Sequence, residues 1–284
     1  MKTVASRETR NLLQYPYLLW SSLFIVVPLV LVLWYSFTTP TPTGRYEFSI
    51  SNYRRFFEPV YLRVMSRSIL LAFEATLICL ALGYPAAMIM VRLGSKWRNT
   101  LLLLLVLPMW INFLLRTYSW MVLLGRQGVL NQLLQWMGLP PQSILYSRGA
   151  VLIGMVYNFL PFMILPLYTS LSKIGKEQIE AAEDLGANRF DVFRRVIFPL
   201  SLPGILTGTT MVFMPAVSTF VISALLGGGQ DMLIGNLIEQ QFLSTGDWHF
   251  GSALSILMMV IILIAMTVVS LTDKGKTFEE GNLW

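Results

Sequence analysis

The sequence predicts an all-α, polytopic membrane protein with six transmembrane helices, and three observations carry this prediction. Of the 284 residues, 55% are hydrophobic and 13% are charged, with a mean hydropathy of +0.62, which lies outside the range of soluble globular domains. Six segments are apolar over about the 20 residues that a helix needs to cross the hydrocarbon core. Lys and Arg side chains are concentrated in alternate connections, as the positive-inside rule requires.

The six expected transmembrane helices are separated by polar, proline-containing or charged connections. We expect them at residues 17–37, 66–91, 99–124, 150–171, 202–226 and 251–271. The first begins after Lys2, Arg7 and Arg10 and has no short apolar core with a cleavage site, so we expect it to remain uncleaved. No linker divides the chain, which predicts a single domain over residues 1–284.

The Lys and Arg count predicts the orientation. With the N-terminus inside, thirteen of the 21 basic residues face the cytoplasm: Lys2, Arg7, Arg10, Arg92, Lys96, Arg98, Lys173, Lys176, Arg189, Arg194, Arg195, Lys274 and Lys276. Six lie outside, and Arg67 and Arg116 fall in the spans: the six are Arg45, Arg54, Arg55, Arg63, Arg126 and Arg148. We therefore expect both termini in the cytoplasm of a multi-pass protein.

The composition also argues against several functions. The net charge of +6 reflects cytoplasmic loops that face anionic lipid, and it does not indicate nucleic-acid binding. One cysteine, Cys79, and one histidine, His249, leave no disulfide and no plausible metal cluster. An intramembrane protease would need a nucleophile and a base at membrane depth, whereas His249 falls in an outer segment. We expect no catalytic or metal-binding residue and a transport role.

A charged segment between the fourth and fifth spans, within the cytoplasmic loop at residues 172–201, reads as two short helices. Gly186 ends the first, because glycine readily adopts the left-handed geometry at a helix C-terminus. Asn188 can cap the second, with Asp191 three residues on. Pro199 marks where this helix yields to the next span. Apolar positions at helical spacing lie on both halves: Ile179, Ala182 and Leu185, then Phe190, Phe193, Val196 and Ile197.

The pattern at Glu180, Ala181, Ala182, Gly186 and Pro199 resembles the EAA loop of permease subunits of bacterial ABC importers. Val196 and Phe198 replace the usual Ile and Leu of its ending but stay apolar. The resemblance implies that the loop, including Asp184, docks into a cleft on a cytoplasmic ATPase. The alternative is an ordinary amphipathic cytoplasmic loop.

Residues 80–87, 160–168, 233–242 and 247–253 narrow the resemblance to PotB-type permeases of spermidine/putrescine importers. It implies the MetI-like fold of type I importers, the bacterial inner membrane, and import by alternating access. The implied partners are a second permease, two copies of an ABC ATPase and an extracytoplasmic solute-binding protein. The chain lacks a G-x-x-x-x-G-K-[ST] phosphate loop, so ATP and Mg²⁺ are expected on the ATPase and no cofactor on this chain.

Two charges in the spans are candidates for the solute path. Glu74, an acid unexpected in this family, lies about eight residues, or roughly 12 Å, from the outer end of the second span. Arg116 lies at a similar depth in the third span. An ionisable group at that depth normally faces a partner or a water-filled cavity. Either the two form a structural ion pair, or they line the path; a snorkelling Arg116 also stays open.

Further candidates mix polar, aromatic and soft apolar side chains, any of which could merely pack between helices. They are Asn112, Tyr157, Asn158, Met214, Ser218 and Phe220. Glu239 and Asp247 belong to an outer segment without Lys or Arg, which would attract a cation if it is more than a solvated loop. His249 replaces an expected proline there, and with Glu74 it leaves open an importer of opines or other amino-acid derivatives. A proton-coupled secondary transporter is the alternative of another class, but it leaves the charged loop unexplained.

Overall fold

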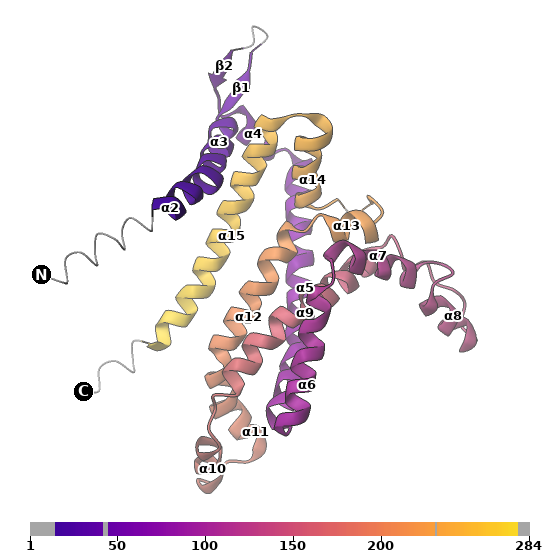
Figure 1. Cartoon of the computed structure of the whole chain (residues 1–284), viewed down its shortest axis with the longest axis vertical. Coiled ribbons are helices and arrows are strands. Elements are labelled where there is room, and N and C mark those ends of the chain that lie inside the picture. The colour runs from indigo at the N-terminus through magenta and orange to yellow at the C-terminus, as the bar shows by residue number, and fades with distance from the viewer. Residues whose placement is uncertain (1–14, 42–44, 231, 278–284) are drawn as a thin grey trace, which may run out of the picture. The chain divides into compact units, whose positions relative to one another are not determined.

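The computed structural model describes residues 15–41, 45–230 and 232–277 (Figure 1). Lys2, Arg7 and Arg10, on which part of the predicted orientation depends, lie outside these ranges, and so do the side chains of Lys274 and Lys276. The elements described below are therefore those of the chain between Tyr15 and Thr277.

The all-α, six-helix expectation is confirmed. Five helical stretches are long and apolar enough to cross a membrane: Pro16–Ser36, Pro59–Arg92, Arg148–Leu171, Arg189–Ser218 and Trp248–Val269. A bent pair, Ser95–Trp110 with Phe113–Trp136, whose axes differ by 97°, makes the sixth when it is counted as one broken span.

The chain forms two compact units, Met1–Leu62 with Ile238–Val260 and Arg63–Leu237 with Ile261–Trp284. The single domain expected for residues 1–284 stays a prediction. The first unit holds α2 (Tyr15–Ser21), a π-helical turn η1 (Ser22–Val26), α3 (Val27–Ser36), β1 (Thr38–Pro40), β2 (Tyr46–Phe48), α4 (Ser51–Phe56), a π-helical turn η4 (Gln241–Thr245), and the first parts of α5 (Pro59–Arg92) and α15 (Trp248–Thr277).

The first unit is held together by polar contacts that the sequence did not predict. Strands β1 and β2 pair antiparallel, with Thr38 opposite Phe48. His249, only 8% exposed, places Nδ1 3.0 Å from the Thr38 hydroxyl oxygen. The Asn52 amide donates to the Thr38 carbonyl at 3.0 Å. These bonds fasten α4 and the start of α15 to the strands, so His249 is a buried structural residue and not an exposed loop histidine.

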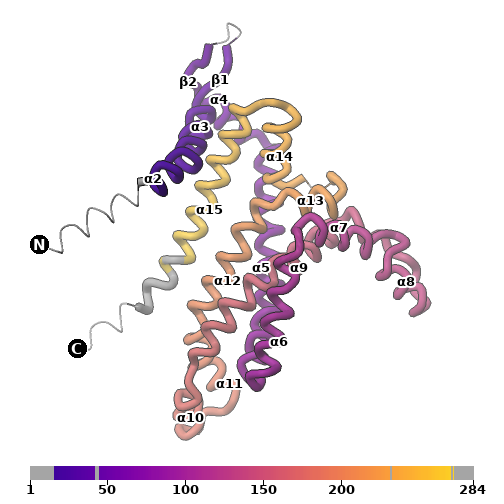
Figure 2. The backbone as a smooth tube through the Cα atoms, viewed as in Figure 1, coloured from indigo at the N-terminus to yellow at the C-terminus, as the bar shows by residue number. Residues whose placement is uncertain are grey.

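The second unit contains the rest of α5 and α15 and most of the remaining helices (Figures 1 and 2). They are α6 (Ser95–Val106), a 3₁₀ turn η2 (Leu107–Trp110), α7 (Phe113–Leu124), α8 (Val129–Trp136), α9 (Arg148–Leu171), α10 (Lys176–Asp184), α11 (Arg189–Val192), a π-helical turn η3 (Phe193–Ile197), α12 (Phe198–Ser218), α13 (Val221–Leu226) and the start of α14 (Ile234–Gln240).

Helices α5, α9 and α12 approach one another closely because glycines face their neighbours. A Cβ at Gly83 of α5 would lie 3.0 Å from the Met163 side chain of α9. A Cβ at Gly204 of α12 would lie 2.9 Å from the Pro166 carbonyl oxygen, and one at Gly208 would lie 2.7 Å from the Met163 sulfur. Larger residues at these positions would separate the helices.

The third span, expected as one helix at residues 99–124, is instead broken. Pro108 lies in the 3₁₀ turn, and the backbone is extended at Ile111, with ψ 140°, and at Asn112, with ψ 130°. The Asn112 side chain then accepts a hydrogen bond from the Leu114 N–H at 2.8 Å and starts α7. Pro108 prevents α6 from continuing. Asn112, a residue that prefers to cap a helix, then starts α7 in another direction.

The fifth span also differs from its expected bounds of 202–226. The helix runs through Pro199 and Pro203 without a break, because the turn before them is π-helical and the Phe198 N–H bonds to the Phe193 carbonyl. This wider turn takes up the register change that a proline imposes. The helix ends at Ser218, and extended backbone at Thr219, with ψ 136°, precedes α13.

Candidate functional site

The charged segment has the two-helix form that its sequence predicts. Helix α10 ends at Asp184, Leu185 is its C-cap, and Gly186 adopts φ +82°. The Gly186 N–H donates to the Glu183 carbonyl at 2.9 Å and the Ala187 N–H to the Ala182 carbonyl at 3.1 Å. This is the double hydrogen bond of a glycine-terminated helix, and it holds the two halves at a fixed angle.

The second half begins at the predicted cap. The Asn188 side chain accepts hydrogen bonds from the N–H groups of Phe190 and Asp191, both at 3.0 Å. The α11 helix then passes without interruption into η3 and α12. A displacement of α11 is therefore carried directly into a helix that is long enough to cross the membrane.

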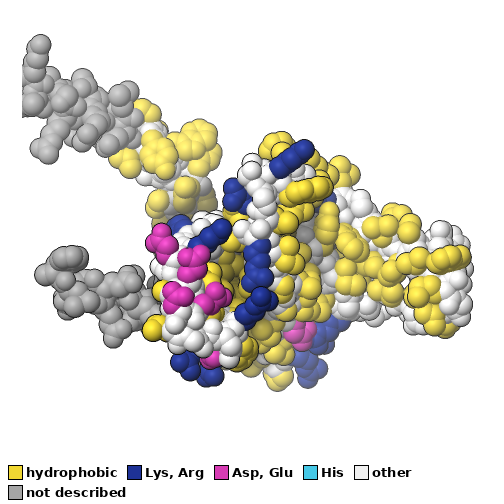
Figure 3. All heavy atoms as spheres, turned by 90° about the horizontal axis from the view of Figure 1, so that it is seen from below, with side chains coloured by type: hydrophobic (Ala, Val, Ile, Leu, Met, Phe, Trp, Pro, Cys, Tyr) yellow, Lys and Arg dark blue, Asp and Glu magenta, His cyan; other side chains and the backbone are white. Residues whose placement is uncertain are grey.

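The outer face of this segment is free within the described chain. Glu180, Ala181, Asp184 and Gly186 are exposed, and Ala182 and Pro199 are half-buried. Viewed towards the α10 end, acidic side chains gather beside a row of basic ones (Figure 3).

Two apolar side chains on that face differ from the sequence expectation. Leu185 is 90% exposed and Phe190 is 69% exposed, although helical spacing placed both on the apolar stripes of the two halves. Val192 is the buried residue of α11 instead. The φ of Gly186 turns the chain between the two halves, which directs Leu185 outward. Exposed apolar side chains beside charged ones are typical of a surface that binds another protein.

The inner side of the segment is attached to all three central helices of the second unit. Ile179 of α10 lines a cavity of about 100 Å³ with Met88 of α5 and Leu171 of α9. The hydroxyls of Tyr84 and Ser201 lie 2.9 Å apart and join α5 to α12. The Tyr84 ring also contacts Phe193 edge to face, with centroids 5.9 Å apart. The segment thus has a free outer face and an anchored inner face.

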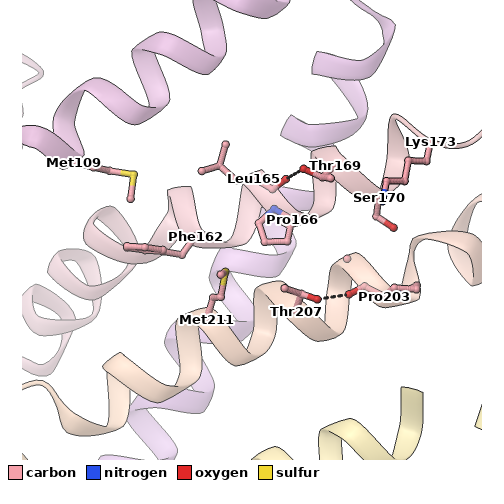
Figure 4. A pocket seen from close by; sticks show the side chains of 11 residues that line it. Met109, Phe162, Leu165, Pro166, Thr169, Ser170, Lys173, Pro203, Thr207 and Met211 are labelled. Carbon is pink, nitrogen blue, oxygen red and sulfur yellow. Dashed lines mark hydrogen bonds between the residues drawn. The ribbon is translucent and has the colours of Figure 1, made fainter. Parts of the chain in front are cut away.

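A cavity of about 520 Å³ lies between α9 and α12 (Figure 4). It is lined by Met109, Phe162, Leu165, Pro166, Thr169, Ser170, Lys173, Pro203, Gly204, Thr207 and Met211. The lining residues include no Asp or Glu, and Lys173 is their one charged side chain. Figure 4 shows the α9 side chains facing those of α12, with Met109 and Lys173 towards opposite ends.

The cavity combines an apolar wall with neutral hydrogen-bonding groups. The Thr169 and Thr207 hydroxyls donate to carbonyls of their own helices, at 2.9 and 2.8 Å, and their oxygens can still accept. Pro166 has no N–H, so the carbonyl of Phe162, one turn earlier on the same face, loses its usual helical donor. The cavity therefore offers hydrogen-bond acceptors and apolar surface to a flexible molecule that carries several donors. Its lining has no negatively charged side chain.

None of the ten residues predicted for the solute path lines this cavity. A signal was nevertheless present in the sequence, because the lining residues of α9 recur at helical spacing: Phe162, Leu165, Pro166, Thr169, Ser170 and Lys173. That face mixes prolines and hydroxyls. The prediction chose single polar, charged or aromatic residues from several spans and did not consider this face of α9 as a whole, so it missed the cavity.

An ion pair between Glu74 and Arg116, one of the alternatives that the sequence left open, does not form in the structure. Glu74 Oε1 accepts a hydrogen bond from Arg148 Nη2 at 2.6 Å. Helix α5 begins at Pro59 and not near residue 66, so Glu74 lies farther from its start than expected. The Arg116 guanidinium instead lies 5.8 Å from the Phe113 ring centroid, within the bent third span.

Three other predicted residues have local contacts. Asn112 caps α7, as described above. The Tyr157 ring contacts Trp120 edge to face at 5.2 Å. Asn158 is 2% exposed; its amide N–H donates to the Gly154 carbonyl at 2.8 Å, and its Oδ1 has no partner among the described residues.

The remaining predicted residues fall in different places. Met214 lines a second, mostly apolar cavity of about 300 Å³ between α12 and α15. The Ser218 hydroxyl donates to the Met214 carbonyl at 3.1 Å. Phe220 is 41% exposed at the break before α13, and Glu239 is half-buried in α14. These side chains do not form one site.

Asp247 in the first unit is neutralised by an arginine. Its carboxylate lies 2.8 Å from Arg55 Nη1, and the Arg55 guanidinium lies 4.1 Å from the Phe250 ring centroid. Burial alone lowers the pKa of Arg55, but hydrogen bonds to Tyr61 and Asp247 outweigh it and raise that pKa. The pairing weakens the expectation of an acidic vestibule, because Asp247 is not available as a free negative charge. Among the described residues, no group of three His, Cys, Asp or Glu side chains could hold a metal ion.

Comparison with known proteins identifies the family to which the chain belongs. Residues 79–276 match the family described as "Binding-protein-dependent transport system inner membrane component". The chain is 41% identical over 253 residues to the spermidine/putrescine transport system permease protein PotB of Escherichia coli K12, covering 88% of this chain and 92% of that protein. It is 44% identical to PotB of Haemophilus influenzae, covering 88% of each chain. The E. coli inner membrane ABC transporter permease YdcU is 28% identical, covering 89% of this chain and 86% of that protein.

Solved structures show the same fold. A chain of a bacterial ABC transporter involved in the import of the acidic polysaccharide alginate matches with a TM-score of 0.80 at 18% identity, covering 97% of this chain and 100% of that one. The same transporter in complex with its alginate-bound periplasmic protein matches with a TM-score of 0.77 at 17% identity, covering 94% and 96%. At this identity the match establishes the fold and not the solute.

Proposed function

Because the chain belongs to the family of binding-protein-dependent transport system inner membrane components, we propose that it is the permease through which an ABC importer carries spermidine or putrescine inward. The chain is an inner-membrane, multi-pass transport subunit, and the ATPase of such a system is a separate subunit. The observation that carries the choice of solute is the identity of 41 to 44% to PotB over 88% of the chain.

The proposed assembly contains three kinds of partner. A second, different permease completes the passage, two copies of a cytoplasmic ATPase bind ATP and Mg²⁺, and an extracytoplasmic protein delivers the solute. The solved alginate importer, whose fold this chain shares, supports the last of these, since it forms a complex with a periplasmic protein.

The ATPase is proposed to dock on the outer face of the α10 to α11 segment. Glu180, Ala181, Ala182, Asp184 and Gly186 would contact it, with Pro199 at the junction with the membrane. Exposed acids and the exposed Leu185 support this placement. Closure of the ATPase pair would move α11, and the unbroken helix from Arg189 to Ser218 would carry that motion to the cavity. In alternating access, this motion would open the space between α9 and α12 towards one side of the membrane at a time.

We place the inner part of the solute passage in the 520 Å³ cavity between α9 and α12. A polyamine is a flexible methylene chain with several ammonium donors. The methylenes suit Met109, Phe162 and Met211, and the donors suit the hydroxyl and carbonyl oxygens. The absence of an acid from the lining avoids tight binding that would slow release, and Lys173 at one end discourages a cation from remaining there.

The proposed orientation has both termini in the cytoplasm. It rests on the distribution of Lys and Arg along the sequence. It also agrees with the proposal that the α10 to α11 segment, called the coupling segment below, faces an ATPase. The α10 end of the second unit is then the cytoplasmic end, and the α13 end is the outer end. Labelling of single cysteines placed at Leu185 and Tyr146 in intact cells tests this: only the latter should react with an impermeant reagent.

The experiment that tests the function is uptake by the complete importer in proteoliposomes with radiolabelled putrescine or spermidine outside and ATP inside. We expect uptake that requires ATP, the binding protein and the ATPase, and that an excess of unlabelled polyamine abolishes. Uptake of an opine or amino-acid derivative in place of polyamines would contradict the proposed solute. Uptake that persists without ATP and collapses with the proton gradient would contradict the proposed mechanism.

A further inference from the structure

The ion pair between Glu74 of α5 and Arg148 of α9 is unusual in its position along the helices. Glu74 precedes Arg92, the last residue of α5, by 18 positions, or about 27 Å at 1.5 Å per residue. The hydrocarbon core is about 30 Å thick. With Arg92 at the cytoplasmic surface, Glu74 lies near the outer boundary of the core, where Arg148 begins α9. The pair therefore joins the first turn of α9 to a point near the middle of α5, and the opposite ends of both helices meet the coupling segment.

The Glu74 and Arg148 side chains make a single contact with each other, which leaves hydrogen-bonding capacity on both. This contact runs from Arg148 Nη2 to Glu74 Oε1 at 2.6 Å. The side chains are 50% and 42% exposed, and the described residues provide no other hydrogen bond or ion pair to either. Ion pairs whose two side chains are this exposed contribute little to stability. A second cation that reaches Glu74 can thus replace the guanidinium at little cost.

Arg148 belongs to a segment that is tied to α13. The Tyr146 N–H donates to the Leu226 carbonyl at 2.9 Å. Tyr146 adopts φ +64°, and its ring lies so close to Gly228 that a Cβ there would be 2.5 Å away. Helix α13 follows α12, which continues from the coupling segment. A change in the spacing of α5 and α13 would therefore alter the distance between Glu74 and Arg148.

We propose that Glu74 is an exchangeable counter-ion at the outer end of the passage: Arg148 neutralises it in the absence of solute, and an ammonium group of the entering solute takes the place of Arg148. The carboxylate is then never left without a positive partner at the edge of the hydrocarbon core, where a bare charge is costly. Glu74 is a specificity-determining residue for amines, and Arg148 is the internal competitor that lowers their apparent affinity. This inference rests on the proposed function.

The test compares charge variants in the complete importer, with KM and maximal rate of ATP-dependent putrescine uptake measured separately. Glu74→Gln should raise KM several-fold, and Arg148→Gln should lower KM, because it removes the competitor. The maximal rate and the ATPase activity should change little in both. Recovery of all subunits in purification shows that each variant assembles.

The reversed pair, Glu74→Arg with Arg148→Glu, separates this role from a purely structural one. A structural ion pair is restored by the reversal, and uptake would return to the wild-type KM. An exchange site is not restored, because an arginine then occupies position 74, so we expect KM to remain raised at least as far as in Glu74→Gln. The doubly neutral Glu74→Gln/Arg148→Gln variant, which leaves no unpaired charge, should resemble Glu74→Gln.

Two results would overturn the proposal: a wild-type KM in the reversed variant, or shifts of KM in the same direction in both single variants. Its failure is distinguishable from failure of the proposed function. If wild-type importer takes up no polyamine, the function is wrong; if the wild type is active and the variants behave as a structural pair, only the exchange role is wrong.

Discussion

Tyr84 of α5 and Ser201 of α12 are joined by a hydrogen bond of 2.9 Å between their hydroxyls, one helical turn beyond the point where the coupling segment enters α12. Ser201 is fully buried, and its hydroxyl donates to the Phe198 carbonyl at 2.8 Å. The Tyr84 ring contacts Phe193. The helix that continues from α11 is therefore hydrogen-bonded to α5 at a point between the coupling segment and the cavity.

Tyr84→Phe should weaken this fastening without emptying the space that the ring fills. Loss of one hydrogen bond costs about 0.5 to 1.5 kcal/mol, while the contact with Phe193 remains. We expect the number of solute molecules imported per ATP hydrolysed to fall, with ATP hydrolysis largely retained. Tyr118→Phe is the control, because Tyr118 is 46% exposed and its hydroxyl makes no hydrogen bond to any residue that the structure describes. An unchanged ratio for Tyr84→Phe would show that this contact does not contribute to coupling.

Gly186 requires a left-handed backbone, with φ +82°. Proline is restricted to φ near −65°, so Gly186→Pro should disrupt the angle between α10 and α11 and abolish ATP-dependent uptake while the protein still inserts into the membrane. Gly186→Ala should cost roughly 1 to 2 kcal/mol of local strain and reduce uptake partially, since a Cβ there meets no other atom within 4 Å.

The matched control for that pair is Gly175→Ala in the same loop. Gly175 has φ −69°, and a Cβ there also meets nothing within 4 Å. Uptake and membrane insertion, measured together for the three variants, should rank Gly175→Ala near wild type, then Gly186→Ala, then Gly186→Pro. Normal uptake by Gly186→Pro would contradict a role of this segment in coupling.

Gly204→Ala tests the close packing of α9 against α12. The added Cβ would lie 2.6 Å from the Ser170 Cβ and 2.9 Å from the Pro166 carbonyl oxygen, neither of which can move without shifting a backbone. Overpacking of this kind costs about 1 to 3 kcal/mol, so the thermal midpoint of the purified protein should fall. Gly149→Ala in α9 is the control, because its Cβ would meet only the Ser147 hydroxyl at 3.5 Å; an equal midpoint for both variants would argue against the close approach.

Thr207→Phe should obstruct the proposed passage. Thr207 lines the 520 Å³ cavity, and an aromatic ring would occupy part of the space that a polyamine needs. We expect uptake to fall strongly while the subunits still assemble. Thr209→Phe places the same ring towards the second cavity, of about 300 Å³, and should spare uptake. The reverse order of effects would move the passage to that second cavity.

The sequence by itself determined the features that depend on residues close together in the chain. The six apolar segments, the helix end at Gly186 and the cap at Asn188 follow from local composition and from the backbone preferences of glycine and asparagine. The family resemblance at Glu180 to Pro199 and in the later spans also led to the correct family. Each of these features could be predicted because its hydrogen bonds and its contact with lipid involve neighbouring residues.

Only the tertiary structure decided which distant residues meet. The partner of Glu74 is Arg148, 74 positions away, and not Arg116, because the third span bends at Ile111 and Asn112 and α5 starts earlier than its apolar core. The cavity between α9 and α12 depends on how closely Gly204 and Gly208 let these helices approach. Such contacts arise from the packing of whole helices against one another, and periodicity within one helix does not specify the neighbour that it faces.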